Sequence, residues 1–317
     1  MKIKVLKFGG TSVGSIEAIK RSADIIHDWS KKSKVIAVLS AMSGETDRLI
    51  NLTKSFSKNP NPIDFDNAVS SGENVSCALM SICLNNQKIK AKSLLSWQIP
   101  IITSSEHMKS RILSINKKFL YDELENFEVL LIPGFQGINN KGELTTLGRG
   151  GSDTSAVAVA AAMETECIIY TDVEGVFTAD PNVVPKAKKI NKISYEEMLE
   201  LASQGAKVLQ TRSVELAMRK NTKLSVRSSF KPKKIGTMIT DEKSVLENNT
   251  VSGITYSKDE AKITLSRVQD KPGVSSKIFG PLAKGNINVD MILQNVSQDG
   301  KFANLSFTLP RLDLEKA

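Results

Sequence analysis

Strand-like segments in this chain run repeatedly into loops of small residues and then into helical patterns. The strands are expected at residues 3–8, 34–39, 129–132 and 168–171, which are rich in β-branched and other apolar residues. Units of this kind join parallel strands through helices. The pattern therefore predicts an α/β fold in which helices cover both faces of a mostly parallel sheet.

The segment 147–155, LGRGGSDTS, leads directly into the apolar run 156–163. Its glycines permit left-handed backbone, and Ser152, Asp153 and Thr154 are residue types that cap helix N-termini. The helix that follows is apolar on every side, so we expect it to be buried. Its first turn offers free N–H groups to an anion, and Arg149 adds a guanidinium that suits a carboxylate or phosphate. A loop of this composition can also simply turn the chain.

A second glycine-rich loop, Gly9 to Gly14, follows the first expected strand. Its spacing imitates a P-loop, but Ser15 stands where that motif requires lysine, so a Walker-type nucleotide site is not supported. Lys7 precedes the glycines instead. At the carboxyl edge of a parallel sheet its ammonium group would point into the crevice that the glycine amides line; the alternative is a lysine that faces solvent.

Length and composition indicate two soluble domains. The chain has 317 residues, 40% of them hydrophobic and 24% charged. The net charge of +9 comes from scattered lysines, and aromatic residues make up only 5%, so we expect steering of small anions and no nucleic-acid partner. Residues 1–7 do not resemble a signal peptide, and no apolar run reaches membrane-spanning length. We therefore expect a cytoplasmic protein without membrane contact.

The cysteines and histidines exclude several kinds of chemistry. Cys77, Cys83 and Cys167 are too few and too dispersed for a disulfide framework, and no pair of them has zinc-ligand spacing. His27 and His107 lie in no recognisable motif, which argues against histidine-based nucleophilic catalysis and against a zinc centre.

The C-terminal part changes character. Residues 1–240 form the expected catalytic domain, the polar residues 241–249 a linker, and residues 250–317 a smaller α+β domain. In this domain the sequence predicts a β-α-β-β-α order that stops before a final strand. We expect its strands at 261–268, 287–294 and 303–309, a helix at 274–284 and the start of another helix at 312.

Four motifs together resemble the signatures of the aspartate kinases, which have the three-layer amino-acid-kinase fold. They are KFGGTSV at 7–13, SAMSG at 40–44, GRGGSDT at 148–154 and TDVEGVFTADP at 171–181. The C-terminal segment resembles an ACT (ferredoxin-like) regulatory domain. The resemblance implies ATP-dependent phosphorylation of the L-aspartate side chain to 4-phospho-L-aspartate, the first step towards lysine, threonine and methionine. Because that carboxylate has a pKa of about 3.9, it needs no general base, and positioning and charge neutralisation suffice.

The resemblance also implies roles for single residues. Lys7 and Asp153 would be catalytic, and Mg²⁺ would be held by ATP oxygens and water without a dedicated protein ligand. The residues expected to bind ATP are Lys7, Gly9, Gly10, Thr171, Asp172, Phe177, Asp180 and Lys207. Those expected to bind aspartate are Ser40, Ala41, Thr46, Glu73, Arg149, Ser152 and Asp153. Asn288, Val289, Asp290 and Gln294 would bind a lysine or threonine effector.

The chain departs from the family pattern in three places. Asn182 stands where an arginine near the phosphates is common, and Phe177 where tyrosine is frequent. Relatives usually carry two ACT units, whereas this chain stops within the first, so we expect a truncated regulatory module. An incomplete ACT sheet leaves an open edge, and we expect a homodimer.

Two alternatives stay open at this point. One is another kinase of the same fold with a different small-molecule acceptor. The other is a non-catalytic amino-acid sensor, against which Lys7, Arg149, Asp153 and Lys207 argue.

Overall fold

The computed structural model describes residues 2–206, 208–241, 252–256, 258–285, 287–297 and 301–317. The chain divides into two compact units, Met1–Thr255 and Tyr256–Ala317. Apart from Asp241, the expected linker 241–249 lies outside the described residues. Among the described helices, none is long and apolar enough to cross a membrane.

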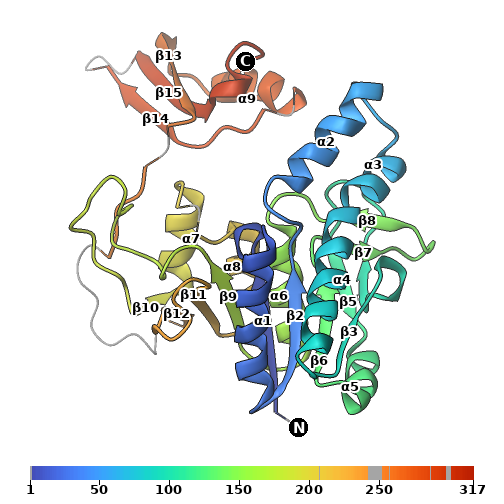
Figure 1. The fold of residues 1–317 in the computed structure, drawn as a ribbon. Coiled ribbons are helices and arrows are strands. Elements are labelled where there is room, and N and C mark those ends of the chain that lie inside the picture. Colours follow the sequence, from blue (N-terminus) through green and yellow to red (C-terminus); the bar gives the residue numbers. More distant parts are fainter. Residues whose placement is uncertain (1, 207, 242–251, 257, 286, 298–300) are drawn as a thin grey trace. The chain divides into compact units, whose positions relative to one another are not determined.

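The first unit is built on an eight-stranded sheet in the order β10-β12-β11-β9-β1-β2-β6-β3, drawn in Figure 1. Every neighbouring pair is parallel except β11 with β12. The mostly parallel sheet predicted from the sequence is thus confirmed. Its strands are β1 (Ile3–Phe8), β2 (Lys34–Leu39), β3 (Ala91–Ser93), β6 (Val129–Pro133), β9 (Cys167–Thr171), β10 (Lys192–Ser194), β11 (Leu224–Ser228) and β12 (Thr237–Thr240).

Helices cover both faces of this sheet, because apolar side chains of its central strands point alternately to the two sides and both sets are buried. Val5 belongs to one buried cluster, whereas Leu6 and Phe8 of the same strand belong to another. The second cluster contains side chains of α1 (Ile16–Ser30) and α4 (Ser71–Asn86). The first contains side chains of α5 (Lys117–Asn126), α6 (Gly151–Ala162), α7 (Tyr195–Ser203) and α8 (Thr211–Lys220).

A smaller four-stranded sheet, in the order β5-β4-β7-β8, lies in the same unit. Its strands are β4 (Ile101–Thr103), β5 (Ile112–Ile115), β7 (Gln136–Ile138) and β8 (Leu144–Thr146). The hairpin predicted around Asn140 joins β7 to β8, with Gly142 in a left-handed conformation. Two further helices, α2 (Glu45–Phe56) and α3 (Pro62–Val69), precede α4.

The second unit has an antiparallel sheet in the order β13-β15-β14, with one helix, α9 (Val274–Lys284). Its strands are β13 (Glu260–Gln269), β14 (Ile292–Val296) and β15 (Phe302–Pro310). The strand predicted at 287–294 begins only at Ile292. Ile287 and Val289 instead pack into the hydrophobic cluster of this unit, so their apolar character reflects burial and not strand pairing. The helix predicted from residue 312 is only a short 3-10 turn, Arg311–Asp313.

Candidate active site

Lys7 lies near the carboxyl end of β1, between β2 and β9, whose carboxyl ends meet at the same edge of the sheet. Its Nζ is 2.6 Å from Oδ1 of Asp153, which belongs to the first turn of α6. Both side chains are nearly buried, with exposed fractions of 11% and 10%. This short ion pair fixes the ammonium group of Lys7 in the crevice and rejects the alternative of a lysine that faces solvent.

The loop after β1 packs closely against its neighbours. The N–H of Gly9 donates to the carbonyl of Tyr170, and a Cβ at Gly9 would lie 3.3 Å from Nζ of Lys7. A Cβ at Gly10 would lie 3.1 Å from the carbonyl oxygen of Ala41. Glycine therefore lets the backbone run beside the lysine and the Ser40–Gly44 loop, as a close approach to phosphate requires.

The start of α6 explains the glycines of the GRGGSDT motif. Gly150 caps the helix with a φ of 70°, and a Cβ there would lie 2.1 Å from Cγ of Gln210. Only glycine satisfies both the conformation and the space. Because the helix begins at Gly151, Ser152 and Asp153 lie inside its first turn and are not its cap, contrary to the capping role their residue types suggest. The predicted burial is confirmed: all residues from Gly151 to Ala160 are buried.

Glu73, in the first turn of α4, has a buried carboxyl group. It is 3% exposed; its Oε1 accepts a hydrogen bond of 3.1 Å from the N–H of Ala41, and its Oε2 has no partner among the described residues. Burial raises the pKa of Glu73 to about 8, although the hydrogen bond from Ala41 works in the opposite direction. The site therefore contains a carboxyl group that is largely neutral at pH 7 and has a free oxygen.

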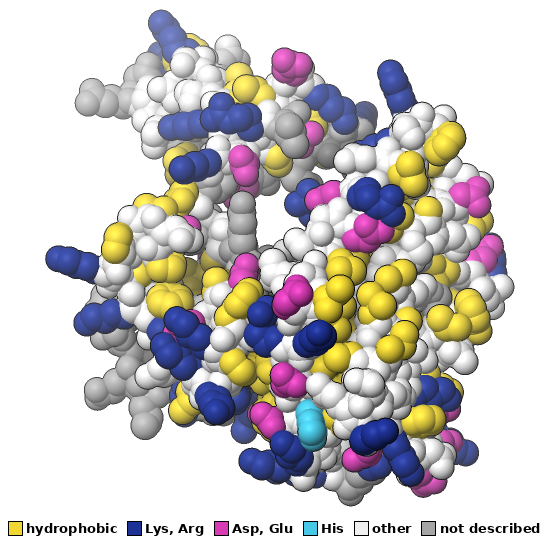
Figure 2. Space-filling model, viewed as in Figure 1, with side chains coloured by type: hydrophobic (Ala, Val, Ile, Leu, Met, Phe, Trp, Pro, Cys, Tyr) yellow, Lys and Arg dark blue, Asp and Glu magenta, His cyan; other side chains and the backbone are white. Residues whose placement is uncertain are grey.

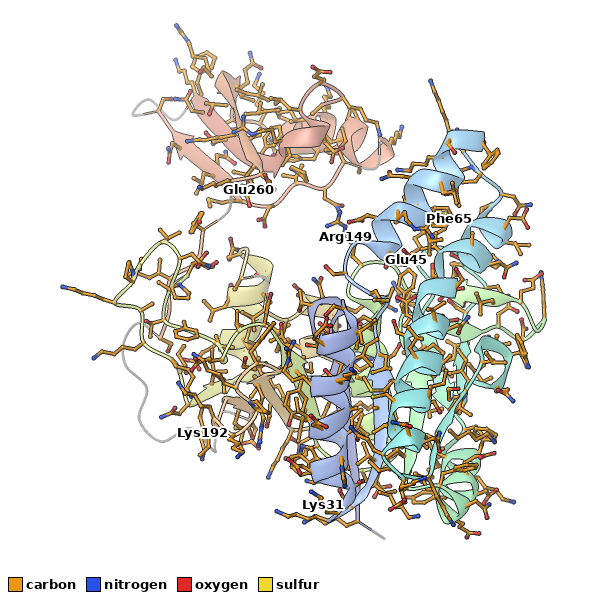
Figure 3. All side chains as sticks on the ribbon, in the orientation of Figure 1. Lys31, Glu45, Phe65, Arg149, Lys192 and Glu260 are labelled. Carbon is orange, nitrogen blue, oxygen red and sulfur yellow. The ribbon has the colours of Figure 1, made fainter. Side chains whose placement is uncertain are left out.

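The remaining residues predicted to bind aspartate lie at the starts of α2 and α6 and in the loops before these helices. The N–H of Ser40 donates to the carbonyl of Phe8, which ties the two loops together, and Thr46 is half-buried in the first turn of α2. Ser152 packs against the end of β6, because a Cβ at Gly134 would lie 2.8 Å from Cβ of Ser152. Arg149 is exposed and forms no ion pair with any described residue. Arg149 and Glu45 lie at one end of the first unit and Lys31 at the other (Figure 3).

The residues predicted to flank the nucleotide lie in the segment after β9. Thr171 ends that strand, and its hydroxyl donates to Oδ1 of Asp172 at 3.0 Å. Phe177 is half-buried and pairs with Lys189 in an isolated β-bridge, whereas the exposed Asp180 accepts from the N–H of Asn182. Within the described ranges, no hydrogen bond or ion pair joins these residues to Lys7 or Asp153. Lys207, also predicted here, lies outside the described residues.

The residues predicted to bind the effector lie in the second unit. Asn288 and Val289 line a cavity of about 420 Å³ beside α9. Asp290 and Gln294 do not line it: the N–H of Asp290 donates to the carbonyl of Thr308, and the Gln294 amide donates to Asp270 at 3.1 Å.

Two links close to the site were not evident from the sequence. The first is between the loops after β1 and β11, where the hydroxyl of Ser12 donates to that of Ser229 at 2.9 Å. The N–H of Ser229 in turn donates to the carbonyl of Thr171, so both loops are tied to the end of β9. Small hydroxyl side chains carry no sequence signal that distinguishes this link from an ordinary loop.

The second link is the fully buried carboxylate of Asp66 in α3. It accepts hydrogen bonds from Nδ1 of His107, the N–H of Met108, and both the N–H and hydroxyl of Thr146. Thr146 ends β8, just before the loop that carries Arg149. Asp66 therefore anchors this loop, and His107, which fitted no motif, is one of its partners.

Metal-binding side chains are not clustered in the part of the chain that the structure describes. No group of three or more His, Cys, Asp or Glu residues there has the geometry to hold a metal ion.

Family models match most of the chain. The amino acid kinase family model matches residues 2–228, and the ACT domain model matches residues 263–317. An aspartate kinase from Pseudomonas putida is 48% identical over 320 aligned positions, which cover 100% of this chain and 77% of that protein.

Solved structures of similar proteins agree with these matches. The chain superposes on an aspartate kinase from Synechocystis with a TM-score of 0.68 and 38% identity, covering 99% of this chain and 53% of the other. Escherichia coli aspartokinase III in complex with aspartate and ADP gives a TM-score of 0.74 at 25% identity. The same enzyme in complex with lysine and aspartate gives 0.76 at 26% identity. In both cases the alignment covers 79% of the E. coli chain and 97% or more of this one.

Proposed function

Because the chain belongs to the amino acid kinase family, and within it to the aspartate kinases, we propose that it transfers the γ-phosphoryl group of ATP to the side-chain carboxylate of L-aspartate. The observation that carries this proposal is the arrangement of Lys7, the glycine loop and the buried Glu73 at one edge of the sheet. The product would be 4-phospho-L-aspartate. Identity of 48% along the whole chain disfavours both a different acceptor and a non-catalytic sensor.

Lys7 would act on the transferred phosphoryl group. Its ammonium group is held by Asp153 and is almost excluded from solvent, so its charge is less screened than at the surface. The backbone of Gly9 and Gly10 would approach the phosphates closely, since neither residue has a side chain in the way. The attacking aspartate carboxylate is ionised at pH 7, so positioning and charge neutralisation account for the catalysis.

Glu73 and Arg149 would bind the two ends of the amino-acid head group. The guanidinium of Arg149 is free to form a bidentate pair with the α-carboxylate. The free Oε2 of Glu73 would accept a hydrogen bond from the α-ammonium group. A cation beside Glu73 lowers the pKa of its carboxyl group, so binding would release a proton. Ser40, Ala41, Thr46 and Ser152 would complete the walls of this subsite.

On the nucleotide side, we assign contacts with ATP to Thr171, Asp172, Phe177, Asp180 and Lys207. Mg²⁺ would be bound by the phosphate oxygens of ATP and by water, since this ion commonly keeps several waters and few protein ligands. We assign catalysis to residues 1–240, regulation to residues 250–317 and the connection to residues 241–249. In the regulatory part, Asn288, Val289, Asp290 and Gln294 would bind lysine or threonine.

We also propose a homodimer that pairs through α4. Val75, Leu79 and Ile82 form an apolar stripe along this helix and are 52%, 40% and 67% exposed. Figure 2 shows apolar side chains gathered over α4. A row of large apolar side chains at helical spacing is more typical of an interface than of a solvated face.

The deciding experiment traps the acyl phosphate product. The chain is incubated with ATP, Mg²⁺ and L-aspartate in the presence of hydroxylamine, which converts an acyl phosphate to a hydroxamate. We expect hydroxamate formation that depends on L-aspartate and none with L-glutamate as acceptor, and we expect no acceptor-dependent release of ADP with carbamate or uridylate. Absence of aspartyl hydroxamate with a chain that is folded by circular dichroism would refute the proposal.

A further inference from the structure

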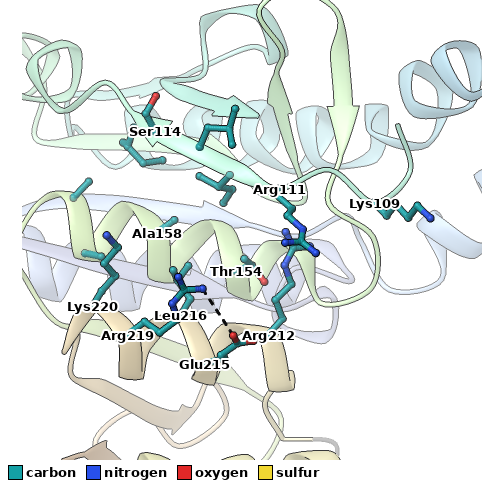
Figure 4. A pocket seen from close by; sticks show the side chains of 15 residues that line it. Lys109, Arg111, Ser114, Thr154, Ala158, Arg212, Glu215, Leu216, Arg219 and Lys220 are labelled. Atoms are coloured by element: carbon teal, nitrogen blue, oxygen red, sulfur yellow. Dashed lines mark ion pairs between the residues drawn. The ribbon is translucent and has the colours of Figure 1, made fainter. Parts of the chain in front are cut away.

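A groove of about 680 Å³ lies between β5, α6 and α8, and neither Lys7 nor the glycines that follow it are among its lining residues (Figure 4). Its floor is formed by the small side chains of α6, including Ala158 and Ala161, and Leu216 contributes an apolar wall. A cavity of this size, with an apolar middle and a few polar groups, is typical of small-molecule sites.

Two arginines meet at one end of the groove. Arg111 and Arg212 point towards one another in Figure 4, and Lys109 lies nearby. Burial lowers the pKa of Arg212 most, and repulsion from Arg111 lowers it further. The two positive charges are therefore close enough to repel each other. Arg111 forms no ion pair with any residue that the structure describes. Two guanidinium groups stay charged at every physiological pH, so an anion is the natural partner for them.

The acidic residues in the neighbourhood do not neutralise this end. Glu215 lies between the two ends, 3.9 Å from Arg219, and its attraction raises the pKa of Arg212 by less than burial and Arg111 lower it. The charges of Arg111 and Lys109 lower the pKa of Glu106, but the hydrogen bond from the Ser104 hydroxyl lowers it more. The groove thus keeps an excess of positive charge around Arg111.

A second positive end is formed by Arg219 and Lys220. Arg212 and Arg219 are seven positions apart on α8, so the two ends are about 10 Å apart along the helix. The alanines of α6 lie between them. This layout suits a molecule with an acidic group at each end and an apolar body.

Arg212 also connects the groove to the Arg149 loop. Its guanidinium donates to the carbonyls of Leu147 and Ser110, both at 2.8 Å. Guanidinium has five N–H donors, so further donors stay available for a ligand. An anion that offsets the repulsion from Arg111 would hold Arg212 in place and, with it, the carbonyl of Leu147, two residues before Arg149.

We propose that this groove is a second ligand site, which binds a small organic dianion between Arg111–Arg212 and Arg219–Lys220 and thereby orders the loop at 147–150. The site is distinct from the proposed acceptor and nucleotide subsites, and it needs no residue assigned to them.

The test is calorimetric titration of the whole chain with adipate, suberate and sebacate, a series of linear dicarboxylates of increasing length. We expect sebacate to bind about tenfold more tightly than adipate, because only the longer chain reaches both ends. Arg111→Ala should weaken all three, and Arg219→Ala should weaken sebacate most. Lys32→Ala, an exposed lysine elsewhere on the unit, should change nothing. Hydrogen exchange at residues 147–150 should slow when sebacate binds.

Several results would overturn the proposal. These are the absence of saturable binding, affinity independent of chain length, or binding that survives Arg111→Ala. If Arg111→Ala instead changes the sedimentation of the chain and no dicarboxylate binds, the groove is an interface between copies and not a ligand site. Because calorimetry requires no turnover, these outcomes are independent of the outcome of the hydroxamate assay.

Discussion

Replacement of Glu73 by glutamine should change how the stability of the first unit depends on pH. The pKa of Glu73 is raised by burial from 4.5 to about 8. Between these values the folded chain holds a proton that the unfolded chain has lost. The free energy of unfolding therefore falls as the pH rises, by about 1.4 kcal/mol per pH unit. The stabilisation is complete below pH 4.5 and is lost as the pH rises through about 8.

Glutamine has the size of glutamate and keeps an oxygen to accept the Ala41 N–H, but it does not titrate. From about pH 5.5 to about pH 7.5 we expect the wild-type chain to lose about 3 kcal/mol relative to Glu73→Gln. Urea unfolding followed by tryptophan fluorescence measures this difference. The signal reports on the first unit alone, because Trp29 and Trp97 are the two tryptophans of the chain.

Glu45→Gln is the matched control. This carboxylate is also at a helix start in the same unit, but the pKa of Glu45 is lowered by its hydrogen bonds with Arg48. Its contribution is lost only at acid pH, so its profile should parallel the wild type over the range tested. If Glu73→Gln also runs parallel to the wild type, Glu73 is ionised in the folded state and the reasoning from burial fails.

Three further substitutions test the proposed site. Lys7→Met should lower kcat about 100-fold to 1,000-fold through loss of charge stabilisation. Lys4 is on the same strand, and Lys4→Met, which breaks its ion pair with Glu166, should leave kcat within about threefold of the wild type. Equal kcat values for the two variants would remove Lys7 from the chemistry. Arg149→Lys keeps the charge but loses the planar guanidinium group, so the KM for aspartate should rise about tenfold with the KM for ATP unchanged. Steady-state kinetics with each substrate varied in turn measure both constants. An equal rise in the two KM values would contradict a role of Arg149 in binding aspartate. Asp66→Asn should lower the free energy of unfolding in urea by about 3 kcal/mol, because it disturbs a fully buried carboxylate that accepts several hydrogen bonds. The control Asp64→Asn, at an exposed position, should lower it by less than about 0.5 kcal/mol. Similar losses for the two variants would contradict an anchoring role of Asp66.

The sequence was most informative where burial and secondary structure coincide. Strands β1 and β2 were predicted at the residues where they occur, because short apolar runs ended by small residues are typical of buried parallel strands. The contact between Lys7 and the glycine loops followed from one rule, that the carboxyl ends of parallel strands meet at one edge. Where apolar residues are buried without pairing, as at Ile287, the same signal placed the start of a strand too early, because β14 begins only at Ile292.

The buried anchor at Asp66 could not be predicted from local pattern. Asp64, Phe65 and Asp66 form an ordinary alternation of charged and apolar residues at the start of a helix. The partners of Asp66 lie between 41 and 80 residues further along the chain. The pKa of Glu73 was equally hidden, since it depends on the enclosure that Ala41 and its neighbours provide and not on the residues next to Glu73. Only the tertiary structure brings these groups together.

The uneven burial of α6 and the loop before it bears on how such a site can change in evolution. Asp153 belongs to a helix whose first ten residues are all buried, so any substitution near it also perturbs the packing of the core. Arg149, four residues earlier, is exposed and can be exchanged at little cost to the fold. Under the proposed roles, a new acceptor specificity is therefore accessible through changes in the loop, whereas changes around Lys7 and Asp153 would also disturb the core.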